Sequence, residues 1–376
     1  MTRNLSVSLE SVRGLAALVV LVAHAVQWFV WPLVGKASPV VAVTQHAAHF
    51  AVLVFFTLSG YVICFSMSRH AAKNGALDET AFLKARVLRI IPPFAFAFVV
   101  SLAVAGIIGL VGFPTVSGPD GSGVAAAARI SASSKFKDIL ATGLLSNGMI
   151  PGTGPIATNG PLWSLSYEVW LYVLAMLVWI STEGRWRTSR SRIAAVAVGI
   201  FVVLQIGQPL RFLECAGYWS IGAAVFLRRH QPRFRRLIDG ILAALLVIGV
   251  LELALFWKRV WPLSELNIRL FPAKSVFLVL ALLLFARLHT AIPHAVQRPL
   301  GWLAASSYTL YITHFPLLMM LYVVAWRPYT TLSATGKAAF LSAACAGVIL
   351  FCHVVARYFE DRARWSRLMG WETRAS

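Results

Sequence analysis

Long apolar stretches separated by short polar or basic segments recur along the whole chain. Each is about as long as the ~20 residues that an α-helix needs to cross a hydrocarbon core of roughly 30 Å. We therefore expect about ten membrane helices, whose boundaries are set only to within a few residues. In chain order they span residues 9–31, 43–67, 87–112, 161–181, 192–209, 211–228, 237–257, 272–288, 303–326 and 338–358.

The composition points the same way. Of the 376 residues, 59% are hydrophobic and only 13% are charged, whereas about a quarter of the residues of a soluble domain are charged. The mean hydropathy is +0.74. No polar segment is long enough to form an independent soluble domain. The sequence predicts an all-α polytopic membrane protein in which residues 1–376 form a single membrane-embedded domain.

The formal net charge is +20, which in a soluble protein would suggest a nucleic-acid partner. Here the basic residues lie in short clusters between apolar stretches, for example at 69–89 and 185–192. Such clusters are retained in cytoplasmic loops and set the orientation of a membrane protein. With the N-terminus inside, most of the 34 Lys and Arg fall on the cytoplasmic face. We expect both termini to be cytoplasmic and no nucleic-acid partner.

One loop on the outer face, residues 114–160, is long and rich in Gly, Ser, Thr and Ala. It contains an amphipathic piece near Phe136 to Leu145. Long loops in compact proteins are usually functional or disordered. The pattern is compatible with a lid or re-entrant element over an external pocket, and equally with a simple connector.

Ionisable residues inside a membrane helix are costly, so each is a functional candidate. Arg13 and His24 lie eleven residues apart, which is about three helical turns and a rise of ~16 Å, so they share one face of the first helix. Glu10 precedes Arg13 by three residues and can pair with it. The spacing suits a charged ligand anchored at the mouth of the bundle with its reactive end at His24. The alternative is a structural histidine that is hydrogen-bonded to a neighbouring helix.

Arg86 and Arg89 share a helix face at the start of the third predicted span. Paired guanidinium groups match phosphate oxygens in geometry and charge. The alternative is simple anchoring of the helix at the cytoplasmic interface.

The fourth predicted span opens with polar residues at helical spacing. Ser164, Glu168 and Tyr172 follow one another at four-residue intervals and line one face. Glu168 is a candidate for orienting a histidine or binding a sugar hydroxyl, or for a purely structural interhelical network. Trp163 and Tyr167 at the outer end are candidates for stacking on sugar rings.

A second polar stripe lies on the ninth predicted span, where Tyr308, Tyr311 and His314 recur at three-residue intervals before Pro316, which is expected to kink the helix. These three side chains are candidates for a supporting role, which for His314 is structural or catalytic.

His46 and His49 show the spacing of a metal pair but lack a third ligand nearby, so no metal site is expected.

Taken together and in this order, these groups resemble the acyltransferase-3 family of membrane acyltransferases, and the resemblance spans nearly the whole chain. The matching residues are Glu10, Arg13-Gly14-Leu15-Ala16-Ala17 and His24, then Phe55 to Tyr61, Arg86 and Arg89 with Pro92, Trp163-Ser164-Leu165 with Glu168 and Tyr172, and Ser307-Tyr308 to His314 with Pro316. Family members typically carry Asp at the position of Glu10, a conservative difference that keeps the pairing with Arg13 possible. The chain looks like a stand-alone version without an appended esterase-like domain.

The resemblance implies an O-acyltransferase of a bacterial inner membrane. It implies an acyl-CoA donor on the cytoplasmic side, in the first place acetyl-CoA acting as co-substrate, and no bound cofactor. The acceptor would be a hydroxyl of a carbohydrate or glycolipid. His24 becomes the candidate base or transient acyl acceptor, and Arg13, Arg86 and Arg89 become candidates for holding the CoA phosphates. The competing prediction is a transporter or flippase, which would favour inverted repeats and charges at the midplane of the membrane.

Overall fold

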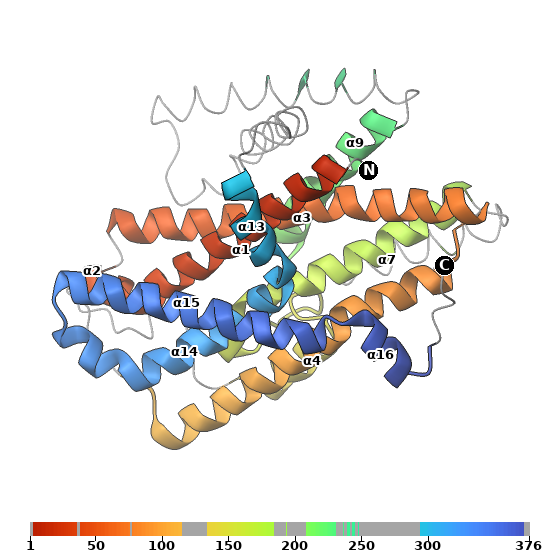
Figure 1. The fold of residues 1–376 in the computed structure, drawn as a ribbon. Helices are drawn as coiled ribbons and strands as arrows, with labels where there is room; N and C mark the ends of the chain where they lie inside the picture. The colour runs from red at the N-terminus through yellow and green to blue at the C-terminus, as the bar shows by residue number, and fades with distance from the viewer. Residues whose placement is uncertain are drawn as a thin grey trace.

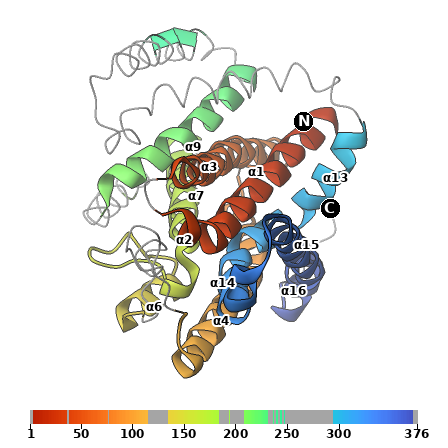
Figure 2. The same ribbon diagram turned by 90° about the vertical axis from the view of Figure 1, so that its left-hand side faces the viewer.

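The computed structural model describes residues 3–35, 38–75, 77–114, 134–183, 208–230 and 294–371, together with a few isolated positions between 193 and 247. All regular structure in this part of the chain is helical. Figure 1 shows long helices that run roughly along one direction, and the view along this direction in Figure 2 places the first helix near the middle of the bundle.

The first half of the bundle consists of α1 (Arg3–Phe29), the short α2 (Trp31–Val34), α3 (Pro39–Asn74) and α4 (Glu79–Val111). Their ends follow local chemistry. The Ser38 side chain accepts a hydrogen bond from the backbone N–H of Val40, and Asp78 does the same for Ala81, so both act as N-caps. Gly75 ends α3 with a φ of 72°, a conformation that glycine adopts without strain.

The second half begins with α6 (Phe136–Gly143), the 3₁₀ segment η1 (Ala157–Leu162), α7 (Trp163–Glu183) and α9 (Pro209–His230). It ends with α13 (His294–Ala305), α14 (Ser307–Thr331), α15 (Ala334–Phe359) and α16 (Arg362–Leu368). α1 packs against α3, α13 and α14, while α3 packs along α9, and α14 lies between α4 and α15 (Figure 2).

Within the described residues six helical segments are long and apolar enough to cross a membrane: Ser8–Phe29, Pro39–Lys73, Glu79–Val111, Ala157–Trp179, Ser307–Thr331 and Ala334–Phe359. They correspond to six of the predicted spans, and α9 supplies a helix where 211–228 was predicted. Three predicted spans, 192–209, 237–257 and 272–288, lie outside the described residues. The polytopic all-α class is confirmed, and the total of ten spans and the cytoplasmic termini stay predictions.

α3 and α9 approach each other closely through two glycines. A Cβ added at Gly60 would overlap the carbonyl oxygen of Trp219, and one added at Gly222 would overlap the carbonyl oxygen of Thr57. Small residues are what allow two membrane helices to bring their backbones together. The contact explains why the Phe55 to Tyr61 motif contains a glycine.

The described part of the long loop folds back onto the bundle. The amphipathic piece predicted near 136–145 is a helix, α6, and η1 then packs against α4 and α14. Pro316 has no N–H, so the carbonyl of Ile312 has no partner within α14. The Asn159 side-chain amide of η1 donates to that carbonyl at 2.8 Å and to the Ser101 hydroxyl at 3.0 Å. The loop thus supplies the hydrogen bond that the proline removes.

Candidate functional site

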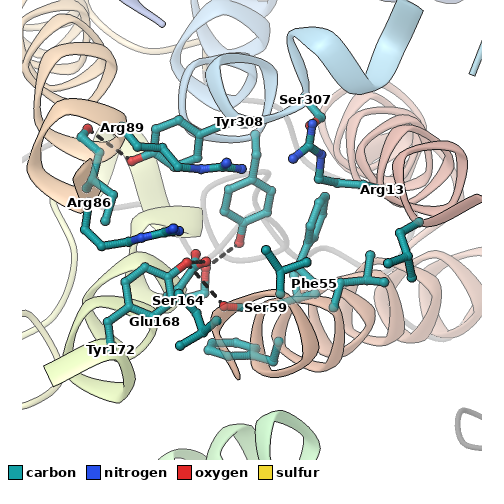
Figure 3. A pocket seen from close by; sticks show the side chains of 18 of the residues that line it. Arg13, Phe55, Ser59, Arg86, Arg89, Ser164, Glu168, Tyr172, Ser307 and Tyr308 are labelled. Carbon is teal, nitrogen blue, oxygen red and sulfur yellow. Dashed lines mark hydrogen bonds between the residues drawn. The ribbon is translucent and has the colours of Figure 1, made fainter. Parts of the chain in front are cut away.

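A cavity of about 310 Å³ lies between α1, α3, α4, α7 and α14. Its walls bring together residues from all five motifs that carry the family resemblance, although these lie as far apart in the chain as Glu10 and Tyr311. The lining residues include Glu10, Arg13, Phe55, Ser59, Arg86, Arg89, Ser164, Glu168, Tyr172, Ser307, Tyr308 and Tyr311 (Figure 3). These side chains come from five different helices, so the cavity exists only in the assembled bundle.

Three arginines dominate one part of the cavity. Figure 3 shows Arg86 and Arg89 pointing into it from α4, and Arg13 pointing toward them from α1 on the opposite side. Arg13 donates from Nη2 to the carbonyl of Ala304 at 2.7 Å, and Arg86 donates from Nη2 to the Ser66 hydroxyl at 3.2 Å. Both of these hydrogen-bond partners are neutral, while the carboxylates of Glu10 and Glu168 line the same cavity near Arg13 and Arg86, respectively.

The same two arginines also carry buried N–H donors that no described residue accepts. The Nε–H groups of Arg13 and Arg86 are buried and have no hydrogen-bond partner among the described residues. A buried, unsatisfied donor on a charged group is costly, and an anionic ligand in the cavity would relieve that cost. The arrangement therefore suits the phosphates of a ligand such as CoA, as the resemblance implied.

A fourth arginine that the sequence reasoning missed lies beside this cluster. Arg362 begins α16, which packs against α4. Partial burial, together with the neighbouring guanidinium groups of Arg89 and Arg86, lowers the pKa of Arg362. Nothing in the sequence singled out Arg362, because the positive-inside rule accounts for all the basic residues of the C-terminal segment alike.

The hydroxyl and carboxylate groups of Ser59, Glu168 and Tyr172 line another part of the cavity. The Tyr172 hydroxyl donates to the Glu168 carboxylate, one turn earlier on α7, through a short hydrogen bond. The Ser59 hydroxyl of α3 donates to the Tyr172 oxygen at 3.2 Å. Glu168 therefore has a partner in the membrane and lies near the arginines, while its assignment as a catalytic group stays a prediction.

The inner end of the cavity is formed by α7 and α14. The hydroxyls of Ser164 and Tyr311 are hydrogen-bonded at 2.6 Å, and Tyr308 donates to the carbonyl of Ile90 at 3.2 Å. The Tyr311 ring packs edge-on against Phe55 with ring centroids 5.4 Å apart. Tyr311 lies between the cavity and the His314 ring, whereas Tyr308 lies near Arg89.

His24 and His314 do not line the cavity but lie directly behind Tyr311. The His314 ring centroid is 6.1 Å from that of Tyr311 and 5.2 Å from that of His24. Arg13 and His24 are thus both turned toward the interior, as their spacing predicted. Tyr311 lines the cavity and contacts His314, which in turn contacts His24.

The aromatic candidates at the start of α7 have protein partners. Tyr167 is buried against Phe212 with ring centroids 5.9 Å apart, and Arg211 lies over the Trp163 ring at 5.2 Å. Their proposed contact with a sugar stays a prediction.

One of the two histidines that have the spacing of a metal pair, His49, makes a contact between helices. His49 lies 3.0 Å from the Glu214 carboxylate and so connects α3 to α9. Within the described residues, no group of three or more metal-ligating side chains is brought together.

Comparison with known proteins identifies the family of this chain. The acyltransferase-domain model of the acyltransferase-3 family matches residues 6–357. No curated protein and no solved structure matches the chain. The matched region contains every cavity-lining residue named above, and Arg362, which does not line the cavity, follows it. With the family model covering nearly the whole chain, this helical membrane protein belongs to the acyltransferase-3 family.

Proposed function

We propose that this membrane acyltransferase is an O-acetyltransferase. It takes the acetyl group of cytoplasmic acetyl-CoA and transfers it to a hydroxyl of a carbohydrate or glycolipid in a bacterial inner membrane. The observation that carries the proposal is the cavity with three arginines at one part of its wall and a histidine pair just behind its inner end. The acetyl donor and the class of acceptor come from the family resemblance.

The arginines bind the donor. Arg86 and Arg89 enter the cavity from α4 and Arg13 enters from α1, so phosphate groups placed between them contact guanidinium groups on two sides (Figure 3). Guanidinium forks give paired hydrogen bonds to phosphate oxygens. The pantetheine arm then follows the apolar and hydroxyl-bearing walls toward Ser164 and Tyr311, and Glu168 offers an acceptor for its amide N–H groups.

His24 acts on the reacting groups. The acceptor hydroxyl loses its proton as its oxygen attacks the thioester carbonyl, the C–S bond breaks, and the CoA thiolate takes up a proton. An imidazole with a free lone pair is suited to accept and return such a proton. The same lone pair would serve if His24 first takes the acyl group itself. The Ser164 hydroxyl, at the cavity end nearest the histidines, is suited to donate a hydrogen bond to the oxyanion.

Inverted membrane vesicles supplied with acetyl-CoA labelled on the acetyl group test this function. Vesicles with the wild type should transfer label to glycan or glycolipid, and vesicles with His24→Ala should not. The matched control is His353→Ala on α15, a histidine that stacks on Trp302 away from the cavity. Equal transfer by the wild type and His24→Ala would remove His24 from the chemistry, and absence of both transfer and acetyl-CoA binding in the wild type would refute the proposed function.

A further inference from the structure

Two histidines from different helices face each other inside the bundle. His24 lies on α1 and His314 on α14, and their rings are 5.2 Å apart between centroids with an interplanar angle of 30°. Phe315 lies at 5.1 Å from His24 and so covers the pair from one side. The pairing was not visible in the sequence, where 290 residues separate the two positions.

The hydrogen bonds of each ring define which nitrogen is basic. His314 Nδ1 lies 2.9 Å from the backbone carbonyl of Leu310, one turn earlier on α14. A carbonyl can only accept, so Nδ1 carries the proton and Nε2 carries the lone pair. His24 Nδ1 lies 2.7 Å from the side-chain oxygen of Gln27, and with the Gln27 amide assigned in this orientation Nδ1 is the protonated nitrogen of His24 as well. Both imidazoles therefore keep Nε2 as a free base.

The free nitrogen of His314 has no hydrogen-bond partner. The residue is 1% exposed, and its Nε2 atom is buried without a partner among the described residues. Leaving a buried acceptor unsatisfied is unfavourable. His314 Nε2 is therefore a buried acceptor beside the His24 ring that is open to a hydrogen bond from a hydroxyl group.

No carboxylate serves the pair. In the described part of the chain, the polar groups at the two rings are the Gln27 side chain and the backbone carbonyls of Leu310 and Tyr311, and the aromatic neighbours are Phe315 and Tyr311. The nearest acidic residue lining the cavity, Glu168, is hydrogen-bonded to Tyr172 instead. A proton released between the rings can therefore be accepted only by one of the two Nε2 atoms.

We propose that His314 is a second base of the transfer reaction, with its Nε2 acting on the acceptor hydroxyl beside His24. This inference rests on the proposed function. The hydroxyl proton moves to His314 Nε2 as the oxygen forms its bond to the acyl carbon. At this point His24 Nε2 holds the acyl group and cannot take the proton; the CoA thiolate was released when the acyl group moved to His24, and the bond from the acyl carbon to His24 Nε2 now breaks. The proton on His314 then passes to the CoA thiolate, so CoA leaves as the thiol and both histidines return to the neutral form.

Two isosteric variants separate this role from a structural one. In His314→Asn the side-chain amide can still donate to the Leu310 carbonyl, as Nδ1 does now, but no base remains at the Nε2 position. In His314→Gln the amide reaches the Nε2 position without basicity. Both variants and the His353→Gln control are expressed as the full chain, and initial rates of label transfer are measured against acetyl-CoA concentration.

Both His314 variants should lower kcat by about 10²-fold, the lower part of the range for a positioned general base. Their KM for acetyl-CoA should stay within about twofold of the wild type, because the arginines lie at the other end of the cavity. Direct binding of acetyl-CoA to the purified variants shows that they are folded. His353→Gln should match the wild type in both constants.

The outcomes are distinct. If either His314 variant that binds acetyl-CoA keeps kcat within about threefold of the wild type while His24→Gln is inactive, the second-base role is overturned and the proposed function stands. A fall confined to binding would likewise overturn it, since that would indicate a structural role. If the wild type transfers label from no acyl-CoA, the proposed function fails, and the second-base role fails with it.

Discussion

The hydroxyls of Ser164 on α7 and Tyr311 on α14 are joined by a hydrogen bond of 2.6 Å. This bond closes the cavity on the side of the histidines, because Tyr311 has the cavity on one side and the His314 ring 6.1 Å away on the other. Under the proposed function, an acyl group that enters with CoA would meet these two hydroxyls on the side of the cavity next to the histidines, and Ser164 would donate to the oxyanion.

Replacing Ser164 should therefore affect turnover more than binding. We expect Ser164→Ala to lower kcat about tenfold to a hundredfold with little change in KM, because one oxyanion donor is lost. Steady-state label transfer measures both constants. Ser166→Ala is the matched control: Ser166 is buried on the same helix but does not line the cavity. Equal losses in the two variants would show that Ser164 matters for packing only.

Arg362 should contribute to donor affinity. It lies at the start of α16 near Arg86 and Arg89, so Arg362→Ala is expected to raise the KM for acetyl-CoA about two- to fivefold with kcat unchanged, as for an exposed charge pair. The difference should shrink at high salt because exposed charges are screened. Arg367→Ala, on the same short helix but hydrogen-bonded locally to Ala363, is the control. Identical KM values for the two variants would exclude Arg362 from the phosphate site.

The close contact of α3 and α9 makes a stability prediction. Gly60→Val and Gly222→Val should each destabilise the bundle, by at least the ~1–3 kcal/mol typical of overpacking, because the new side chain would overlap a backbone carbonyl. Thermal unfolding in detergent, followed by loss of the monodisperse peak, measures the effect. Gly106→Ala on α4, where nothing lies within 4 Å of the added Cβ, should leave the unfolding temperature unchanged or raised. Similar curves for all three variants would refute the packing argument.

Asn159 should contribute to stability, because its side chain donates to the Ile312 carbonyl that Pro316 leaves without a helical partner. Asn159→Ala removes the donors to Ile312 and Ser101, and a buried carbonyl without a partner costs about 1–3 kcal/mol. We expect a lower unfolding temperature and a lower rate of label transfer, because Ile312 lies two residues before His314. In the double variant with Pro316→Ala, α14 can satisfy its own carbonyl, so the loss of stability should be smaller. Additive losses would contradict this account.

The membrane helices and their polar faces could be predicted from local sequence. Hydrophobic length identified the membrane helices, because each must satisfy its backbone within itself and cover about 30 Å of hydrocarbon. Helical spacing likewise put Ser164, Glu168 and Tyr172 on one face, and all three line the cavity. Such features depend on residues within a few turns of each other, so they can be read without the fold.

Contacts between distant segments could not be read in this way. Nothing in the spacing of His24 and His314 indicated that their rings meet, and nothing near Asn159 indicated that it would serve Ile312. Arg362 could not be told apart from the other basic residues of the C-terminal segment in the sequence, because only the packing of α16 on α4 places it near Arg86 and Arg89. Each depends on how helices are placed side by side, which is decided by close-packed contacts such as those at Gly60 and Gly222.

The sequence by itself thus determined that this is a helical membrane protein, which helix faces are polar, and which family it resembles. The tertiary structure alone decided that Arg13 from α1 and Arg86 and Arg89 from α4 enter one cavity with Arg362 nearby, that Ser164 and Tyr311 lie between this cavity and His314, and that the histidines form a pair. The physical reason is that periodicity along one helix fixes the direction of its side chains, whereas their partners are fixed only when several helices exclude lipid and pack together.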